Sequence, residues 1–67
     1  MIALSAAKPG KIYTIKWNVS NLSYLNECGL NQGNDIYLAS SFWGNTIIIV
    51  NNKRIALDSS TSFGIKV

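Results

Sequence analysis

The chain has a single cysteine, Cys28, so no internal disulfide can stabilise its 67 residues. Small secreted domains usually depend on such cross-links, and the sequence therefore favours a cytoplasmic protein. The fold must rest on one hydrophobic core, and a hydrophobic fraction of 48% is enough to build it. A chain of this length buries only about 60% of its unfolded surface. It has no room for a catalytic domain beside a cofactor-binding domain.

Charged side chains are scarce. They make up 13% of the residues, against roughly 25% in an ordinary soluble domain. A lightly charged surface loses little when it is desolvated, which suits a protein that docks on another protein. The net charge is +3, but only Lys53 and Arg54 are adjacent cations, and a solvated hairpin accounts for that pair. Nucleic-acid binders concentrate their cations. A small RNA-binding barrel of the Sm-like kind is therefore the alternative, and the scattered charge argues against it.

Most of the chain alternates apolar and polar residues with a period of two, which predicts β-strands. In residues 11–18, the side chains of Tyr13, Ile15 and Trp17 alternate with polar ones and are expected to share one buried face. The further predicted strands span residues 35–41, 46–50, 53–57 and 63–67. The longest purely apolar run, Ile47 to Val50, is far too short to cross a bilayer.

Turn-forming residues separate these segments. Asn51-Asn52 is expected to form a two-residue hairpin loop, since asparagine tolerates positive φ better than most residues. Gly44-Asn45 is expected to form another turn, and residues 58–62 a third.

One segment after the first strand has a helical pattern. Apolar residues recur every three positions at Val19, Leu22, Leu25 and Cys28. Gly29 is suited to end this helix, because glycine adopts the left-handed conformation without strain. Leu30 then lies where a Schellman ending places a contact back onto Leu25. We expect that contact to attach the end of the helix to the rest of the fold.

The predicted architecture is mainly β, with about five short strands and one short helix inserted after the first. Strands this short close most easily into a small barrel, which removes exposed edges.

The order of motifs resembles the FeoA family, ferrous iron transport protein A. Leu4 followed by Lys8-Pro9-Gly10-Lys11 is similar to the family's opening. Leu25 to Gly33, with the sequence LNECGLNQG, is similar to its Leu-x-x-Leu-Gly-Leu-x-x-Gly core. The stretches Arg54 to Leu57 and Ile65 to Val67 resemble its closing motif. The resemblance spans nearly the whole chain, with all three motifs in order.

Membership of this family would imply an SH3-like barrel and a cytoplasmic accessory role in bacterial ferrous iron uptake. The implied partner is FeoB, the membrane transporter that carries its own GTP-binding domain. The structural motif would comprise Leu25, Gly29, Leu30 and Gly33. One departure from the family is Ser62, where a small apolar residue is often found.

Residues suited to catalysis or metal binding are few. The chain has no histidine, and its carboxylates, Glu27, Asp35 and Asp58, lie in separate segments. A transition-metal site needs several converging ligands. The family name suggests transition-metal binding, but we expect no such site in this chain. Cys28 is interpreted as a small buried hydrophobe. We expect no enzyme activity and no cofactor, and a metal carrier remains an alternative.

The aromatic residues offer the best candidate surface. Phe42 and Trp43 precede a predicted turn, where full burial is difficult, and Tyr37 faces away from Ile36 and Leu38. Aromatic residues are enriched at the centres of protein interfaces. The proposed partner-binding residues are Tyr37, Phe42, Trp43 and Ile48. The partner would be the transporter or a second copy of the chain, and the alternative is that these side chains fill the ends of the barrel.

Overall fold

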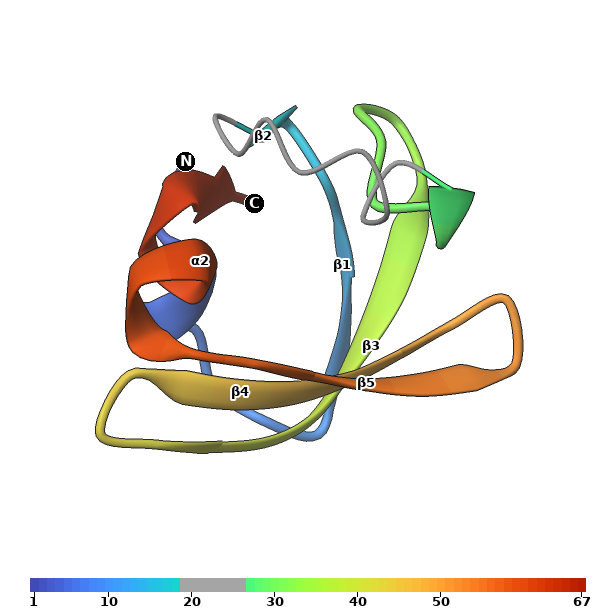
Figure 1. Ribbon diagram of the computed structural model, residues 1–67. Coiled ribbons are helices and arrows are strands. Elements are labelled where there is room, and N and C mark those ends of the chain that lie inside the picture. The colour runs from blue at the N-terminus through green and yellow to red at the C-terminus, as the bar shows by residue number, and fades with distance from the viewer. Residues whose placement is uncertain (19–26) are drawn as a thin grey trace.

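The computed structural model describes residues 1–18 and 27–67 (Figure 1). Within them, β-strands alternate with tight turns, and each helical segment is short. In chain order the elements are η1 (Leu4–Ala6), β1 (Lys11–Thr14), β2 (Trp17–Asn18), β3 (Asp35–Phe42), β4 (Asn45–Val50), β5 (Lys53–Leu57), α2 (Ser59–Gly64) and β6 (Ile65–Lys66).

The strands form two sheets. An antiparallel four-stranded sheet has the order β1-β3-β4-β5, and β2 pairs with β6 in a two-stranded sheet. The N-terminal segment joins the second sheet, because Ile2 and Val67 exchange two backbone hydrogen bonds of 2.8 Å each. Both chain ends therefore lie beside β6 (Figure 1).

Two-residue loops connect the long strands of the larger sheet. Asn51 and Asn52 link β4 to β5 with φ values of 51° and 64°, which confirms the predicted loop. The preceding loop consists of Trp43 and Gly44, one residue earlier than the sequence indicated. A β-bulge between Leu38 and Ser40 shifts the register of β3 against β4.

The first predicted strand, residues 11–18, divides between the two sheets. β1 pairs with β3 and β2 pairs with β6. Between them, the Ile15 backbone N–H donates to the Asn34 carbonyl at 2.9 Å, and the Ile15 side chain is buried. Trp17 consequently leaves the buried face and is exposed. The prediction that Trp17 is buried was wrong, because a period of two does not show where a chain changes sheets.

The C-terminal region differs from its prediction. Residues 58–62 were expected to form a turn, but α2 begins at Ser59, and the final strand is limited to β6. The Asp58 carboxylate accepts a hydrogen bond of 2.9 Å from the Thr61 backbone N–H, which caps the helix. Ser62 lies buried on the inner side of α2, and its hydroxyl is 2.8 Å from that of Thr46 on β4.

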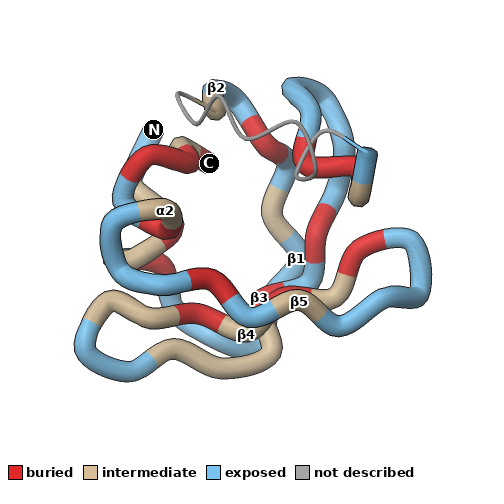
Figure 2. Tube along the Cα trace, viewed as in Figure 1, coloured by how far each residue is buried: buried red, intermediate tan, exposed pale blue. Residues whose placement is uncertain are grey.

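One core lies between the sheets and the helical segments (Figure 2). Alternate residues of the long strands supply it, as the sequence predicted for Ile36 and Leu38. The buried hydrophobic residues are Leu4, Ala7, Ile15, Leu30, Ile36, Leu38, Ile48, Val50, Leu57, Ile65 and Val67. This arrangement of short strands around a single core confirms the mainly β, SH3-like fold class.

The helix predicted across residues 19–28 lies largely outside the described residues, and so does Leu25 with its expected contact to Leu30. Glu27 has helical backbone conformation, and Cys28 and Gly29 form a turn. Leu30 is fully buried.

Candidate interaction surface

An apolar row crosses the outer face of the four-stranded sheet. Ile12 on β1 lies opposite Tyr37 on β3, and Tyr37 lies opposite Ile49 on β4. Directly opposed residues share a face of the sheet. All three side chains point away from the core, and Ile12 and Tyr37 are exposed while Ile49 is half-buried.

The same face extends toward the β3–β4 loop. Ile47 is two residues before Ile49 on β4, so both side chains point outward. Phe42 ends β3 opposite Asn45 and is exposed. The Phe42 and Trp43 rings meet edge to face, with their centroids 6.1 Å apart. We call the set Ile12, Tyr37, Phe42, Trp43, Ile47 and Ile49 the sheet-face surface.

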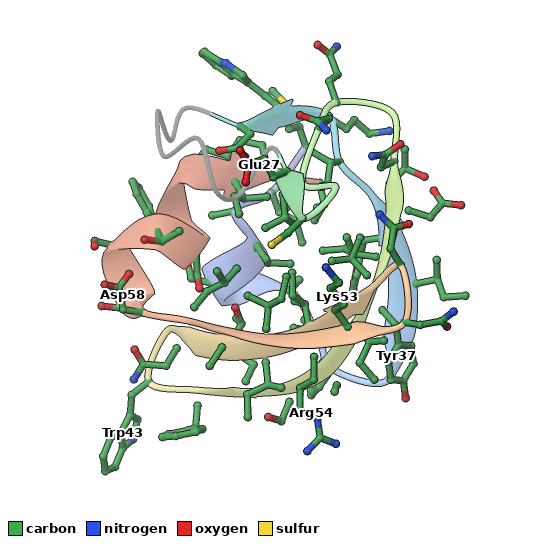
Figure 3. All side chains as sticks on the ribbon, turned by 45° about the vertical axis from the view of Figure 1, so that its right-hand side comes forward. Glu27, Tyr37, Trp43, Lys53, Arg54 and Asp58 are labelled. Atoms are coloured by element: carbon green, nitrogen blue, oxygen red, sulfur yellow. The ribbon has the colours of Figure 1, made fainter. Side chains whose placement is uncertain are left out.

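Trp43 is 91% exposed and has a φ of 52°. A large side chain with positive φ is uncommon, because the left-handed region costs an L-residue roughly 1–2 kcal/mol. Two-residue hairpin loops usually place asparagine, aspartate or glycine at this position, and the β4–β5 loop does so with Asn51. In Figure 3 Trp43 projects outward from the end of its hairpin. The Trp43 side chain therefore combines a strained backbone with very little burial.

One of the four proposed partner-binding residues does not reach the surface. Ile48 is 0% exposed and belongs to the core, so its assignment to the surface was wrong. Its neighbours Ile47 and Ile49 occupy the outward positions instead. Residues 46–50 are apolar on both faces, so the sequence did not distinguish the two sides of this strand.

Sequence reasoning also missed Ile12. Its position beside the predicted inward residue Tyr13 places it on the outer face, which was a usable signal. The cross-strand pair with Tyr37 became visible only with the sheet register. Tyr13 itself is half-buried, and its hydroxyl donates a hydrogen bond of 2.8 Å to the Lys8 carbonyl.

Charged groups lie at the borders of the sheet-face surface. Arg54 on β5 lies opposite Ile49 and is exposed. Figure 3 shows Arg54, Tyr37 and Trp43 on the same side of the sheet. At the start of β3, the Asp35 carboxylate accepts a hydrogen bond of 2.6 Å from the Thr14 hydroxyl. The centre of the surface is therefore apolar and its border is polar, as in protein interfaces.

Asp58 lies between the end of β5 and the start of α2. The hydrogen bond from the Thr61 backbone N–H lowers the pKa of this carboxyl, and the Ser60 hydroxyl adds a weaker contribution. Gly44 lies close to Ser59, where an added Cβ would come within 3.1 Å of the Ser59 Cβ. The capped helix thus supports the loop that carries Trp43.

Gly29, Leu30 and Gly33 of the predicted structural motif lie within the described part of the chain. Gly29 is buried and has a φ of 98°, and a Cβ on it would collide with the side chain of Asn51. The backbone carbonyl of Gly29 also accepts a hydrogen bond of 2.7 Å from the Asn34 side chain. Gly33 has a φ of 92°, and its α-carbon faces open space. Both positions require glycine for the backbone, and Gly29 also requires it for close packing.

No pocket is formed by residues 1–18 and 27–67. The same residues contain no group of three or more histidine, cysteine, aspartate or glutamate side chains that could hold a metal ion. Cys28 is a free thiol and is half-buried rather than buried. Among the described helices, none is both long and apolar enough to cross a membrane.

A small SH3-like barrel with an aromatic face on its larger sheet is the class of protein that these features define. The FeoA domain model matches residues 2–67, and the chain therefore belongs to the FeoA domain family. This confirms the resemblance seen in the sequence motifs.

A solved structure agrees with the family. The crystal structure of an iron uptake regulatory protein, FeoA, matches this chain with a TM-score of 0.83 and 25% sequence identity. The match covers 96% of this chain and 89% of that chain. Comparison with curated proteins gives no match.

Proposed function

We propose that this protein is a non-enzymatic, cytoplasmic accessory of bacterial ferrous iron uptake. It binds the cytoplasmic face of the FeoB transporter and affects the assembly or gating of that transporter. Family membership over residues 2–67 supports the role in iron uptake. The protein would be peripheral at the inner membrane through its partner.

The proposed contact is the sheet-face surface, and Trp43 is the observation that carries it. Burial of an aromatic side chain normally stabilises a fold, but at 91% exposure this indole contributes little burial. Its backbone is also in the left-handed region. Strained residues of this kind cluster at functional sites. A partner that covers Trp43 and Phe42 would give these side chains the burial that the monomer lacks.

The test is a titration against the soluble cytoplasmic domain of the transporter. Trp43→Asn removes the indole and supplies the residue that the β4–β5 loop already uses at positive φ. We expect the variant to fold at least as stably as the parent. Truncation of an interfacial tryptophan commonly costs 2 kcal/mol or more, so affinity should fall about thirtyfold.

Gln32→Ala is the control variant. Gln32 is also exposed, but it lies before the start of β3, whereas Trp43 follows the end of that strand, so the substitution leaves the sheet-face surface intact. Affinity should be unchanged in this variant, and circular dichroism should confirm that both variants are folded. A folded Trp43→Asn protein that binds as well as the parent would exclude the sheet-face surface. Loss of self-association, with no effect on transporter binding, would assign that surface to a second copy of the chain.

A further inference from the structure

A second exposed aromatic cluster lies at the two-stranded sheet. Trp17 on β2 lies directly opposite Lys66 on β6. The Lys66 ammonium is 4.0 Å from the centroid of the Phe63 ring and donates a hydrogen bond of 2.6 Å to the Phe63 carbonyl. Trp17 is 55% exposed and Phe63 is 65% exposed. We call Trp17, Phe63 and Lys66 the β2–β6 surface.

This surface is separate from the sheet-face surface. Figures 1 and 3 both place β2 at the end of the molecule opposite the β3–β4 hairpin. The N-terminal segment runs along the other side of β6, where Ala3 bridges to Lys66. Two aromatic side chains are thus exposed beside a lysine at this small sheet, and neither belongs to the core.

The charge around this surface is positive. Lys16 is exposed and precedes Trp17, and Lys66 lies within the surface. No aspartate or glutamate occurs in residues 1–26 or 59–67. Glu27 is exposed, but if it is counted with this end of the molecule, Lys16 and Lys66 still outnumber it. The complementary partner is therefore negatively charged.

The residue types favour a lipid surface over an acidic peptide. Tryptophan and other aromatic side chains are enriched at the boundary between lipid headgroups and hydrocarbon, and lysine extends its stem along apolar groups while its ammonium reaches phosphate. The described residues form no pocket, and a planar anionic partner requires none.

We propose that the β2–β6 surface binds directly to anionic phospholipid bilayers. Trp17 and Phe63 enter the headgroup region, while Lys16 and Lys66 contact lipid phosphates. Each lysine near an anionic membrane contributes about fivefold to the partition coefficient, and salt weakens the interaction. The protein is then held at the membrane by one end and keeps the sheet-face surface free.

The test uses vesicles of phosphatidylcholine mixed with phosphatidylglycerol, compared with vesicles of phosphatidylcholine alone. In a Trp43→Phe background, Trp17 is the only tryptophan, since the chain has two. Its emission should shift to the blue with anionic vesicles and be quenched by lipids with brominated acyl chains. Cosedimentation should be stronger with anionic vesicles and should fall at high salt.

Variants locate the contact. Lys16→Gln should lower partition about fivefold, and Trp17→Ala should lower it at least as much. Lys53→Gln removes the same charge from the β4–β5 hairpin and should change partition much less. The proposal is overturned by equal binding to both kinds of vesicle, by a Trp17 spectrum that vesicles leave unchanged, or by equal effects of the two lysine variants. If the parent protein self-associates but does not bind vesicles, and Trp17→Ala no longer self-associates, the surface would instead be assigned to a second copy of the chain.

Discussion

At the scale of single residues, the buried pair of Thr46 and Ser62 connects α2 to the sheet. Both residues are almost completely buried, and their hydroxyls are 2.8 Å apart. Among the described residues, no buried side-chain polar atom lacks a hydrogen-bond partner. Removal of one hydroxyl leaves the other without that partner in the core. This pairing explains why a polar side chain is tolerated at the buried position of Ser62.

A double-mutant cycle tests this pair. Thr46→Val and Ser62→Ala should each destabilise the protein by about 1–3 kcal/mol, because each leaves a buried hydroxyl unsatisfied. The double variant should be less destabilised than the sum of the two, since both polar groups are then absent. Urea unfolding followed by circular dichroism measures all four proteins. Strictly additive losses would mean that the two hydroxyls do not depend on each other.

Residue-level prediction from sequence succeeded where a residue matches its local conformation. Asn51 and Asn52 are typical of a hairpin loop with positive φ, and their loop was predicted correctly. Trp43 has the same conformation in the preceding loop, but tryptophan is not typical of it. The conflict between residue type and backbone therefore displaced the predicted turn by one residue. That conflict is also the strongest structural support for a role of Trp43 in binding.

At the scale of elements, α2 depends on its cap. Its residues, Ser59 to Gly64, are mostly serine, threonine and glycine, which are weak helix formers. The helix is stabilised at its start by Asp58 and on its inner face by Ser62. The sequence predicted a turn here, because serine and threonine are common in turns and the partner of Ser62 is distant in sequence.

The Asp58 cap predicts that the stability of the fold decreases as the pH falls in the acid range. Hydrogen bonding lowers the pKa of Asp58 in the folded state, so the carboxylate stabilises the fold at neutral pH. This contribution is lost as the pH falls through the folded-state pKa. In Asp58→Asn, the amide oxygen can still accept the bond from Thr61, but the group no longer titrates. The parent should therefore melt at a higher temperature than the variant, and this difference should be largest at neutral pH.

Thermal melts of both proteins across the acid range measure the effect. The difference in melting temperature should narrow as Asp58 becomes protonated. A constant difference across the whole range would show that the charge on Asp58 contributes nothing to the helix.

The β-strands were predicted more completely than their grouping into sheets. Alternation correctly placed Ile36 and Leu38 inward, because both faces of β3 have distinct environments. The same rule failed at Trp17, since the chain leaves one sheet after Thr14 and enters the other. It was uninformative for residues 46–50, where both faces are apolar. The outward side of β4, and with it the extent of the sheet-face surface, required the observed register.

At the scale of the whole molecule, β2, which carries Trp17, lies at the opposite end from the hairpin loop that carries Trp43 (Figure 1). Each proposed contact can therefore be removed without disturbing the other, because neither set of exposed side chains contributes to the buried core. A domain of this size has a limited reserve of stability. Surfaces that bind partners are best separated from the residues that hold the fold together. The sequence predicted the first cluster because Phe42 and Trp43 precede a turn. It did not predict the second cluster, because Trp17 was expected on the buried face of a strand.

The chemistry of the whole chain makes a final prediction about iron. Ferrous iron is bound tightly by several nitrogen, oxygen or sulfur ligands that converge. The chain has no histidine, one thiol and three carboxylates, and its described residues bring no three such groups together. The isolated protein should therefore bind ferrous iron only weakly in anaerobic equilibrium dialysis, and Cys28→Ser should give the same result. Tight stoichiometric binding that is abolished by Cys28→Ser would contradict this and favour a metal carrier. Weak binding in both proteins would argue against a metal carrier.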